Sequence, residues 1–480
     1  MKKIKDLIKC DYDIDIKGIT DDSRLVKDGY LFVATKGYNV DHYDYIDMAI
    51  ENGCSFIVSD RKIKNFPHKV VDNINKEYRE LCKKYYDVSS DEFSLIGITG
   101  TDGKTTTATI ISKIIGDMAY LGTNGLYVGE KEYKTNNTTP CVSELFSDLA
   151  KVKKNNCNKI SMEVSSEALL HDRVIDFKYD IVGFTNITGD HLNIHKTFKN
   201  YVECKLKLLN LVKENGYVVV NGDDEELNKI KHTNLIKYGF NKNNDYIIED
   251  VKYNKTETTF YIKYNNNRVK VITPLIGEYN VYNVTLAYIV GLLYGRDSSF
   301  LLDKIKELEP IKGRGEILDF GQDYTIVLDY AHTINGIRSI LDTFKNYDQI
   351  ITVTGCAGGR EKEKRPIIGD IIMSNSDVSI FTMDDPRYED VDDIIDDMVG
   401  DKKDYIRIPN RSEAINYALS IANPNSVVLI LGKGRDNYMA IEDKKIKYND
   451  YDVICKYFEW YTGIYIWYLF ILKKYYQFNY

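Results

Sequence analysis

The segment GITGTDGKTTT, residues 97–107, constrains the fold of this 480-residue chain more than any other. An apolar run over residues 93–98 precedes the glycine-rich turn, and the helix-like string ATIISKII follows it. A strand, such a turn carrying Lys-Thr, and a helix form a phosphate-binding unit, because backbone N–H groups and the helix N-terminus both face the anion. The segment therefore predicts a nucleotide-binding α/β domain.

The spacing of this loop differs from the strict P-loop, in which four residues separate the first glycine from the Gly-Lys pair. Five residues separate Gly97 from Gly103, and two separate Gly100 from Gly103. Backbone N–H groups from Gly100 to Lys104 can surround the β- and γ-phosphates, Lys104 adds positive charge, and Thr105 can ligate Mg²⁺. A turn without a ligand is the alternative, and the coincidence of Gly, Lys and Thr after a strand argues against it.

Composition excludes several classes of protein. The formal net charge of −8 argues against a nucleic-acid binder, which would carry a basic surface. The eight cysteines contain no C-x-x-C pair, which indicates a reduced, cytosolic chain without a structural zinc site. The N-terminal residues lack the apolar core of a signal peptide. We therefore expect a cytoplasmic enzyme that takes small anionic ligands.

The order of strand and helix patterns predicts three α/β domains and a tail. We expect an N-terminal domain over residues 1–92, a central domain over 93–308 with a hairpin-rich insert around 245–275, and a C-terminal domain over 309–452. Strands of the last domain end in polar or glycine-rich loops, where ligands bind in open α/β sheets. The tail, 453–480, contains too short an apolar run to span a bilayer, which needs about 20 residues. We expect no stable membrane insertion. A packed C-terminal segment or a sequence irregularity is favoured, an interfacial membrane contact is the alternative, and the role of the tail stays open.

The compressed loop G-T-D-G-K-T-T resembles the ATP loop of the Mur ligase family, enzymes that add amino acids to the peptidoglycan precursor. Further segments resemble the family's other motifs: MEVSSEAL, NITGDHLNIHKTFKNYVECKLKLL, YNVYNVTLA, GRGEIL and LDYAHT. The resemblance spans about residues 18–450. It implies an ATP-dependent amide ligase with three domains, in which the central one is a P-loop-type, mostly parallel sheet and the C-terminal one is Rossmann-like.

The resemblance also implies the catalytic and ATP-binding residues. In the family, an acid and a histidine hold Mg²⁺ and a carbamylated lysine supplies further negative charge. The corresponding catalytic residues here are Lys104, Glu163, His191 and Lys205, of which the last three, together with Thr105, are metal ligands. The implied ATP contacts are Gly100, Thr101, Asp102, Gly103, Lys104, Thr105, Thr106, Asn283 near the adenine, Arg314, Asp329 and His332. Read alone, Glu163 would be a solvated cap and Lys205 a surface lysine.

Within the family, DDSRLVKDGYLFVATKG, NNTTP and EVSS resemble the members that act on UDP-MurNAc-L-Ala-D-Glu. The partners implied are this nucleotide sugar-peptide and a diamino acid. The implied uridine contacts are Ser23, Asn39, Val40 and Asp41, and the implied sugar-peptide contacts are Asn137, Thr138, Thr139, Ser165, His171 and Arg173. His171 stands where many relatives carry a polar neighbour of this arginine, so its contact stays open.

The incoming amino acid depends on a further resemblance. Members that add meso-diaminopimelate carry D-N-P-R, an upstream arginine and G-K-G-x-E. The corresponding residues here are Arg360, Asp384, Asp385, Pro386, Arg387, Gly432 and Asp436. Arg387 can pair bidentately with a distal carboxylate, which lysine lacks. The departures at Asp385 and Asp436 keep or add negative charge and would also suit the distal amine of L-lysine. Diaminopimelate is favoured, and L-lysine is the alternative.

Two other functions are alternatives to the diamino-acid ligase that the resemblance implies. A related ligase with a different acceptor, such as folylpolyglutamate synthetase or cyanophycin synthetase, is opposed by DSR…LFVA and DDPR. A non-catalytic nucleotide-binding scaffold is opposed by the joint presence of Lys104, Glu163, His191 and Lys205. We expect the protein to be a monomer.

Overall fold

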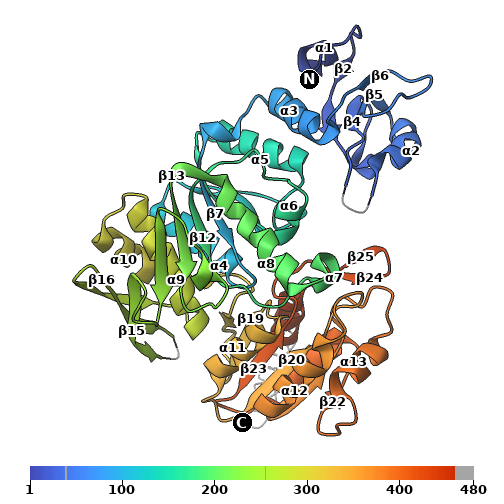
Figure 1. Cartoon of the computed structure of the whole chain (residues 1–480). Coiled ribbons are helices and arrows are strands. Elements are labelled where there is room, and N and C mark those ends of the chain that lie inside the picture. Colours follow the sequence, from blue (N-terminus) through green and yellow to red (C-terminus); the bar gives the residue numbers. More distant parts are fainter. Residues whose placement is uncertain (38–39, 255, 460–480) are drawn as a thin grey trace, which may run out of the picture.

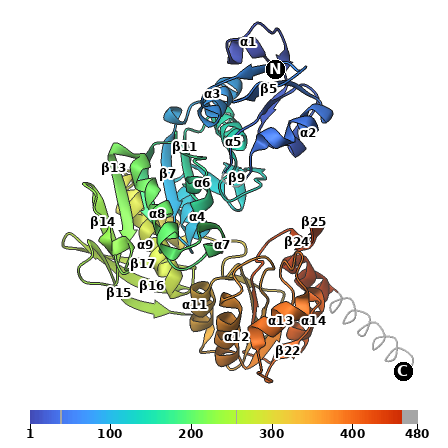
Figure 2. The same ribbon diagram turned by 45° about the vertical axis from the view of Figure 1, so that its right-hand side comes forward.

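Sheets of four, eleven and six strands organise the chain, each flanked by helices (Figure 1). The computed structural model describes residues 1–37, 40–254 and 256–459. The eleven-stranded sheet lies in the middle of the molecule, between the N-terminal and C-terminal parts (Figure 2). The prediction of an α/β fold with a mostly parallel central sheet is confirmed.

The N-terminal part holds a parallel sheet with the order β3-β4-β5-β6. Its central strands are short apolar runs that are almost wholly buried. In chain order the elements are β1 (Lys2–Lys3), α1 (Ile4–Leu7), β2 (Asp15–Ile16), β3 (Gly18–Thr20), η1 (Ser23–Leu25), β4 (Tyr30–Val33), η2 (His42–Tyr45), α2 (Ile46–Glu51), β5 (Cys54–Ser59), β6 (His68–Val70), α3 (Ile74–Tyr86) and η3 (Ser90–Glu92).

The central sheet has the order β10-β9-β8-β11-β7-β12-β13-β14-β15-β16-β17. Its elements are β7 (Ser94–Thr99), α4 (Lys104–Ile115), β8 (Ala119–Gly122), β9 (Gly125–Val128), β10 (Lys131–Tyr133), α5 (Val142–Lys154), β11 (Lys159–Glu163), α6 (Ser166–Leu170), β12 (Tyr179–Phe184), α7 (Leu192–His195), α8 (Phe198–Leu206), η4 (Lys207–Leu211), β13 (Val212–Asn221), η5 (Leu227–Lys229), β14 (Leu235–Gly239), β15 (Tyr246–Tyr253), β16 (Thr258–Tyr264), β17 (Asn267–Thr273), α9 (Glu278–Leu293) and α10 (Ser298–Lys306).

Strand β7 lies between β11 and β12, and all three are parallel. The carboxyl ends of parallel strands share one edge of a sheet, where ligands bind in open α/β folds. The segments after β7 and β12 and the last residue of β11 therefore meet at one place. This edge carries the glycine-rich loop.

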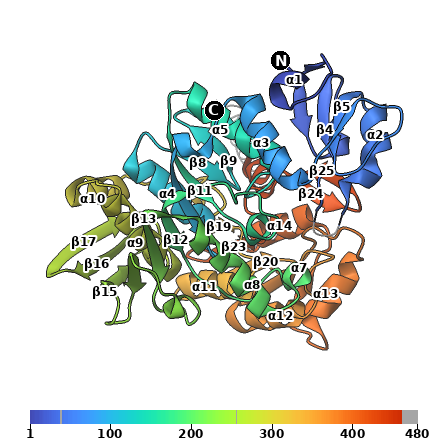
Figure 3. The same ribbon diagram turned by 45° about the horizontal axis from the view of Figure 1, so that its top comes forward.

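The antiparallel strands β15, β16 and β17 form the predicted hairpins, but they are not a separate insert. They continue the central sheet, because β15 pairs in parallel with β14 before β16 and β17 fold back. In Figure 3 they form the far end of that sheet, beside α9 and α10. Alternating apolar residues identify such strands locally, whereas their attachment to β14 is a long-range contact.

The six-stranded C-terminal sheet has the order β18-β19-β23-β20-β21-β22, with only β18 antiparallel. Four of its strands end at segments 330–333, 355–360, 382–387 and 432–436, which therefore share one edge. The elements are β18 (Glu316–Leu318), β19 (Thr325–Asp329), α11 (Ile334–Phe344), β20 (Ile350–Thr354), α12 (Lys364–Asn375), β21 (Val378–Phe381), α13 (Val391–Val399), β22 (Ile406–Arg407), α14 (Arg411–Ser420), β23 (Val427–Leu431), β24 (Tyr438–Ile441) and β25 (Lys444–Lys447).

The apolar cores couple the N-terminal and central parts. One buried cluster contains Phe56 and Tyr78 of the N-terminal part as well as Phe146 and Phe177 of the central part. Burying such aromatic side chains stabilises the packing by about 1.5–3 kcal/mol each. We expect this shared cluster to hold the four-stranded sheet against the central one.

The predicted tail is described only in its first residues. Residues 450–459 are helical, and Ile454 is buried against the C-terminal sheet. The remainder of the predicted tail, residues 460–480, lies outside the described residues. Among the residues that the structure describes, no helix combines the length and apolar character needed to cross a membrane.

Candidate active site

The glycine-rich loop joins β7 to α4, and two of its glycines admit no side chain. A Cβ on Gly100 would lie 1.8 Å from Thr185 Oγ1. Gly103 has a φ of +82°, and a Cβ there would lie 2.5 Å from Asn283 Oδ1. Glycine is therefore required at both positions, for close approach and for the left-handed backbone.

The segment after β12 holds the loop in shape. The backbone N–H of Thr101 donates to the carbonyl of Asn186 (2.8 Å), and that of Asp102 donates to Asn186 Oδ1 (2.9 Å). Thr185 Oγ1 donates to the carbonyl of Asp102 (2.6 Å). The first-turn N–H groups of an α-helix have no intrahelical partner. The loop thus presents the N-terminus of α4 as an anion site.

Two lysines converge on the loop, Lys104 half-buried and Lys205 buried. Lys104 Nζ donates to the carbonyls of Gly100 (2.8 Å) and Thr101 (2.7 Å). Lys205 Nζ, from α8, donates to the same Gly100 carbonyl (2.7 Å) and is only 1% exposed. Burial lowers the pKa of both amines, and the charge of Lys104 lowers that of Lys205 further. Lys205 is therefore not the surface lysine that its local sequence suggests.

Glu163 ends β11 next to the loop and is buried rather than a solvated cap. Its Oε1 accepts hydrogen bonds from Tyr120 Oη (2.6 Å) and the Thr123 N–H (2.8 Å). Its Oε2 accepts from Thr105 Oγ1 (2.9 Å), so Glu163 and the loop threonine are in direct contact.

His191 precedes α7 and lies between the loop and the C-terminal part. Its Nε2 is 3.4 Å from Asp190 Oδ2, and its Nδ1 is 3.9 Å from Glu167 Oε1. That Nδ1 is buried without a hydrogen-bond partner among the described residues. Burial lowers the pKa of His191 to about 4, against the opposing charge of Asp190. Burial alone would raise the pKa of Asp190, but the charges of His191, His332 and Lys364 hold it below its usual value.

Whether a metal ion could bind near the loop depends on which side chains there can act as ligands. Among the described residues, no group of three or more His, Cys, Asp or Glu side chains could hold a metal ion. The buried, unpartnered Nδ1 of His191 and the carboxylate of Glu163 are nevertheless suitable donors near the loop. The residues fit Mg²⁺ if phosphate oxygens and an anionic Lys205 complete the ligand set.

Residues from the C-terminal part reach this loop directly. Arg314 Nη2 donates to Thr105 Oγ1 (3.2 Å), and its guanidinium lies 4.7 Å from the ring centroid of Tyr330. Thr333 Oγ1 lies 3.0 and 3.1 Å from the two carboxylate oxygens of Asp102. The structure therefore brings the predicted Arg314 to the loop across the boundary between two sheets.

The other residues predicted to contact ATP lie around Arg314 and the glycine-rich loop. Asp329 accepts the backbone N–H groups of Gly315 and Ala331, and burial raises its pKa. His332 Nδ1 lies 2.8 Å from the carbonyl of Tyr330. Asn283, on α9, is buried against the loop, where its Oδ1 accepts from Thr107 Oγ1 (3.1 Å). Thr106 is buried in the first turn of α4.

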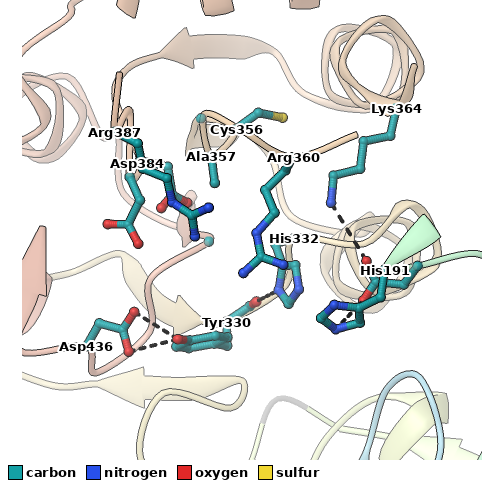
Figure 4. A pocket seen from close by; sticks show the side chains of 14 residues that line it. His191, Tyr330, His332, Cys356, Ala357, Arg360, Lys364, Asp384, Arg387 and Asp436 are labelled. Carbon is teal, nitrogen blue, oxygen red and sulfur yellow. Dashed lines mark hydrogen bonds and ion pairs between the residues drawn. The ribbon is translucent and has the colours of Figure 1, made fainter. Parts of the chain in front are cut away.

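A cavity of about 120 Å³ opens at the carboxyl edge of the C-terminal sheet (Figure 4). Its lining includes Asp190 and His191 of the central part, so the cavity lies where the C-terminal sheet meets the segment after β12. It is lined by Asp190, His191, Tyr330, His332, Gly355, Cys356, Ala357, Arg360, Lys364, Asp384, Asp385, Arg387, Gly432 and Asp436. Pro386 is behind this wall, where its carbonyl packs against Gly358.

The buried side chain of Lys433 forms ion pairs with three carboxylates of this cavity. It is 1% exposed, and its Nζ lies 2.8 Å from Asp385 Oδ1, 3.6 Å from Asp436 Oδ2 and 3.8 Å from Asp384 Oδ1. Burial alone would lower the pKa of Lys433, but these three carboxylates raise it above the usual value. Tyr330 Oη lies 2.8 Å from each carboxylate oxygen of Asp436, to which it donates its one proton.

Unlike Lys433, the two arginines of the cavity have no carboxylate partner among the described residues. The guanidinium groups of Arg360 and Arg387 both point toward the middle of the cavity (Figure 4). Within the described part of the chain, neither guanidinium forms a hydrogen bond or an ion pair. Arg387 has a φ of +53°, a conformation that non-glycine residues rarely adopt.

The predicted sugar-peptide residues lie beside Glu163. Thr139 Oγ1 donates to the Glu163 carbonyl (2.8 Å) and accepts from the Ser165 N–H (2.9 Å). Arg173 Nη1 donates to the Thr139 carbonyl (2.9 Å). Thr138 Oγ1 lies 3.0 Å from Thr123 Oγ1. Asn137 is exposed, and the pKa of His171 is lowered by burial and by Arg173.

The predicted uridine residues are not brought to the loop; they lie in the N-terminal part (Figure 1). Ser23 is buried, with its Oγ 3.2 Å from Met48 Sδ. Asp41 caps η2 and pairs with Arg61, while Val40 is exposed. Asn39 lies outside the described residues.

Sequence reasoning missed four charged or polar residues of the site. They are Lys433, Tyr330, Asp190 and Lys364. The first three lie inside the motifs GKGRD, LDYAHT and GDHL. The sequence therefore shows where they stand in the chain, but not which residues they contact in space. Lys364 had no signal beyond a lysine-rich stretch.

The fold and the loop define a nucleotide-binding α/β protein whose second ligand cavity lies on another sheet. The chain matches the family descriptions "Mur ligase family, catalytic domain" over residues 15–90, "Mur ligase middle domain" over 98–291 and "Mur ligase, glutamate ligase domain" over 313–434. The chain belongs to the Mur ligase family, whose members are ATP-dependent amide-bond-forming ligases.

Relatives and solved structures agree with this assignment. A UDP-N-acetylmuramoyl-L-alanyl-D-glutamate–2,6-diaminopimelate ligase from Fusobacterium nucleatum is 34% identical, with 91% of this chain and 92% of the relative covered. The protein of the same name from Bacillus cereus is 34% identical, with 94% and 97% covered. A solved structure of a ligase of this name gives a TM-score of 0.62 at 26% identity, covering 95% and 99%. The Thermotoga maritima MurF ligase with ADP shares the fold, with a TM-score of 0.65 at 18% identity, covering 86% and 93%.

Proposed function

We propose that this protein uses ATP to join meso-2,6-diaminopimelate to the D-glutamate of UDP-MurNAc-L-Ala-D-Glu in peptidoglycan synthesis. Its membership of the Mur ligase family supports the ligase chemistry. The names of relatives covering more than nine-tenths of the chain support the two substrates. The proposed location is the cytoplasm and the proposed state is a monomer.

The choice of amino acid rests on how the cavity distributes its charges. Lys433 already supplies an ammonium group to Asp384, Asp385 and Asp436. Both candidate amino acids carry a distal ammonium that would share these acids with Lys433, so the acids do not distinguish them. The guanidinium groups of Arg360 and Arg387 are available for a carboxylate, which they bind bidentately. Diaminopimelate has that distal carboxylate and L-lysine lacks it.

The reaction follows from the placement of the two regions. The loop and α4 bind the ATP phosphates, with Lys104 close to the transferring group. The γ-phosphoryl group moves to the D-glutamate side-chain carboxylate, and stabilisation of its charge supplies most of the catalysis. The amine of the amino acid then attacks the acyl phosphate and expels phosphate. Thr138 and Ser165 lie beside Glu163 and orient the acceptor.

Mg²⁺ would be held by Glu163, His191, Thr105 and a carbamylated Lys205, and it would neutralise charge on the phosphates. We propose the carbamate because Lys205 is buried at the loop, in a place where an anionic ligand is needed and a protonated amine cannot coordinate.

The deciding experiment is kcat/KM for both diamino acids, measured as phosphate release with purified protein, ATP, Mg²⁺ and UDP-MurNAc-L-Ala-D-Glu. We expect diaminopimelate to be preferred. A tenfold preference for L-lysine, about 1.4 kcal/mol, would overturn the amino acid and leave the ligase assignment standing. Phosphate release that is independent of the nucleotide sugar-peptide would overturn the ligase assignment.

A further inference from the structure

Asp385 lines the cavity, and one of its carboxylate oxygens contacts two neighbouring segments. Its Oδ1 accepts hydrogen bonds from Lys433 Nζ (2.8 Å) and from the backbone N–H of Ala440 in β24 (2.9 Å). Oδ1 is therefore occupied by two donors, one of them a buried ammonium. The carboxylate therefore connects the 382–387 segment to the 432–436 loop and to the hairpin of β24 and β25.

The same hairpin holds Arg387, two residues later. The Arg387 N–H donates to the carbonyl of Ala440 (3.0 Å), and the Glu442 N–H donates to the carbonyl of Arg387 (2.8 Å). These bonds lie on both sides of a residue with a φ of +53°. A non-glycine residue keeps such a conformation only where its surroundings enforce it.

Ala440 is thus the common point of both contacts, since its N–H binds Asp385 and its carbonyl binds Arg387. On the opposite side, the Gly358 N–H donates to the Asp385 carbonyl (2.9 Å) and ties the segment to the loop that carries Arg360. Loss of the Asp385 carboxylate would free β24 and, through it, the backbone of Arg387.

We propose that Asp385 is a positioning residue: paired with Lys433 through Oδ1, it anchors β24 so that Arg387 points its guanidinium into the cavity, and it acts on the incoming amino acid mainly through Arg387. This inference rests on the proposed function only for the identity of that amino acid. It predicts that KM for the amino acid depends more on a hydrogen-bond-accepting oxygen in the side chain of residue 385 than on the negative charge of that side chain.

Two variants separate the two roles. Asp385→Asn keeps an oxygen for the Ala440 N–H and loses the charge, whereas Asp385→Leu loses both. We expect the asparagine variant to keep KM for diaminopimelate within about threefold and the leucine variant to raise it about 30-fold or more, with a smaller change in kcat. A direct contact with the substrate ammonium would instead make the asparagine variant as poor as the leucine variant.

A double-mutant cycle with Arg387→Ala tests whether Asp385 acts through the arginine. We expect Asp385→Leu to add little to the KM of the Arg387→Ala enzyme. Additive effects on KM would overturn the proposal. Equal melting temperatures and equal KM for ATP in all variants exclude a general loss of structure.

Hydrogen exchange gives a test that needs no catalysis. In the full-length protein without substrates, Asp385→Leu should speed exchange in the peptide covering residues 438–447, and Asp385→Asn should leave it near the wild-type rate. Unchanged exchange in Asp385→Leu would overturn the positioning role. Failure of the wild-type enzyme to use diaminopimelate, with this exchange difference present, would overturn only the proposed substrate.

Discussion

The phosphate loop and the amino-acid cavity both contain lysine or arginine side chains, but these cations are held by different partners. At the loop, Lys104 and Lys205 donate to backbone carbonyls, and within the described residues neither forms an ion pair with a carboxylate. In the cavity, Lys433 is surrounded by carboxylates, while Arg360 and Arg387 have no such partner among the described residues.

The difference shows which cations remain available to a ligand. Carbonyl oxygens orient the loop lysines without cancelling their charge, so a compact ammonium is left for phosphate oxygens. In the cavity the acids neutralise the lysine and leave the planar guanidinium groups, which match a carboxylate. The four predictions below test this contrast, two at the loop, one in the cavity and one at the contact between them.

Lys104→Ala should have the largest effect. It removes the charge next to the transferring phosphoryl group, and we expect ATP turnover to fall by at least about 10²- to 10³-fold. Lys113→Ala, which changes an exposed lysine of the same helix, is the matched control and should behave as wild type. An unchanged kcat in Lys104→Ala would place the phosphate site elsewhere.

Lys205→Ala should be largely inactive as well, by about 10²-fold, because a charge close to the phosphates is lost. If the lysine is carbamylated, added short carboxylic acids should restore part of the rate by occupying the vacated position. Lys199→Ala, an exposed position on α8, serves as the control. A wild-type rate in Lys205→Ala, or a crystal structure showing a bare amine beside two bound Mg²⁺ ions, would contradict the carbamate.

Arg387→Ala tests the cavity. Loss of one buried charge partner should raise KM for diaminopimelate by an amount equivalent to about 2–5 kcal/mol, while any weak activity with L-lysine changes little. The measurement is KM for each amino acid at saturating ATP. An equal loss for both amino acids would mean that Arg387 faces the shared amino-acid backbone and not the distal carboxylate.

Thr333→Val should have the smallest effect, since it changes a contact that joins the two regions. Thr333 Oγ1 donates to Asp102 and accepts from the Gly336 N–H at the start of α11. Losing both bonds should lower the free energy of unfolding by about 1 kcal/mol and raise KM for ATP a few-fold. Thr333→Ser keeps the hydroxyl and should restore both values. A valine variant with unchanged KM would show that this contact does not influence the loop.

The loop and the fold class could be predicted because their signals are local. A strand, a glycine-rich turn and a helix follow one another in the chain, and Gly103 is required by its left-handed backbone. The attachment of β15 to the central sheet could not be predicted in the same way, since pairing between separate strands depends on the whole fold.

The sequence by itself determined the phosphate-binding unit, the α/β architecture and the resemblance to the Mur ligase family, because these depend on residue types at short, fixed spacings. Only the tertiary structure decided how the charges are paired. Lys205 is buried against a loop 105 residues away, and Lys433 pairs with Asp385 from 48 residues away. Such contacts arise when parallel strands bring their carboxyl ends to one edge, and that convergence leaves Arg360 and Arg387 facing the cavity.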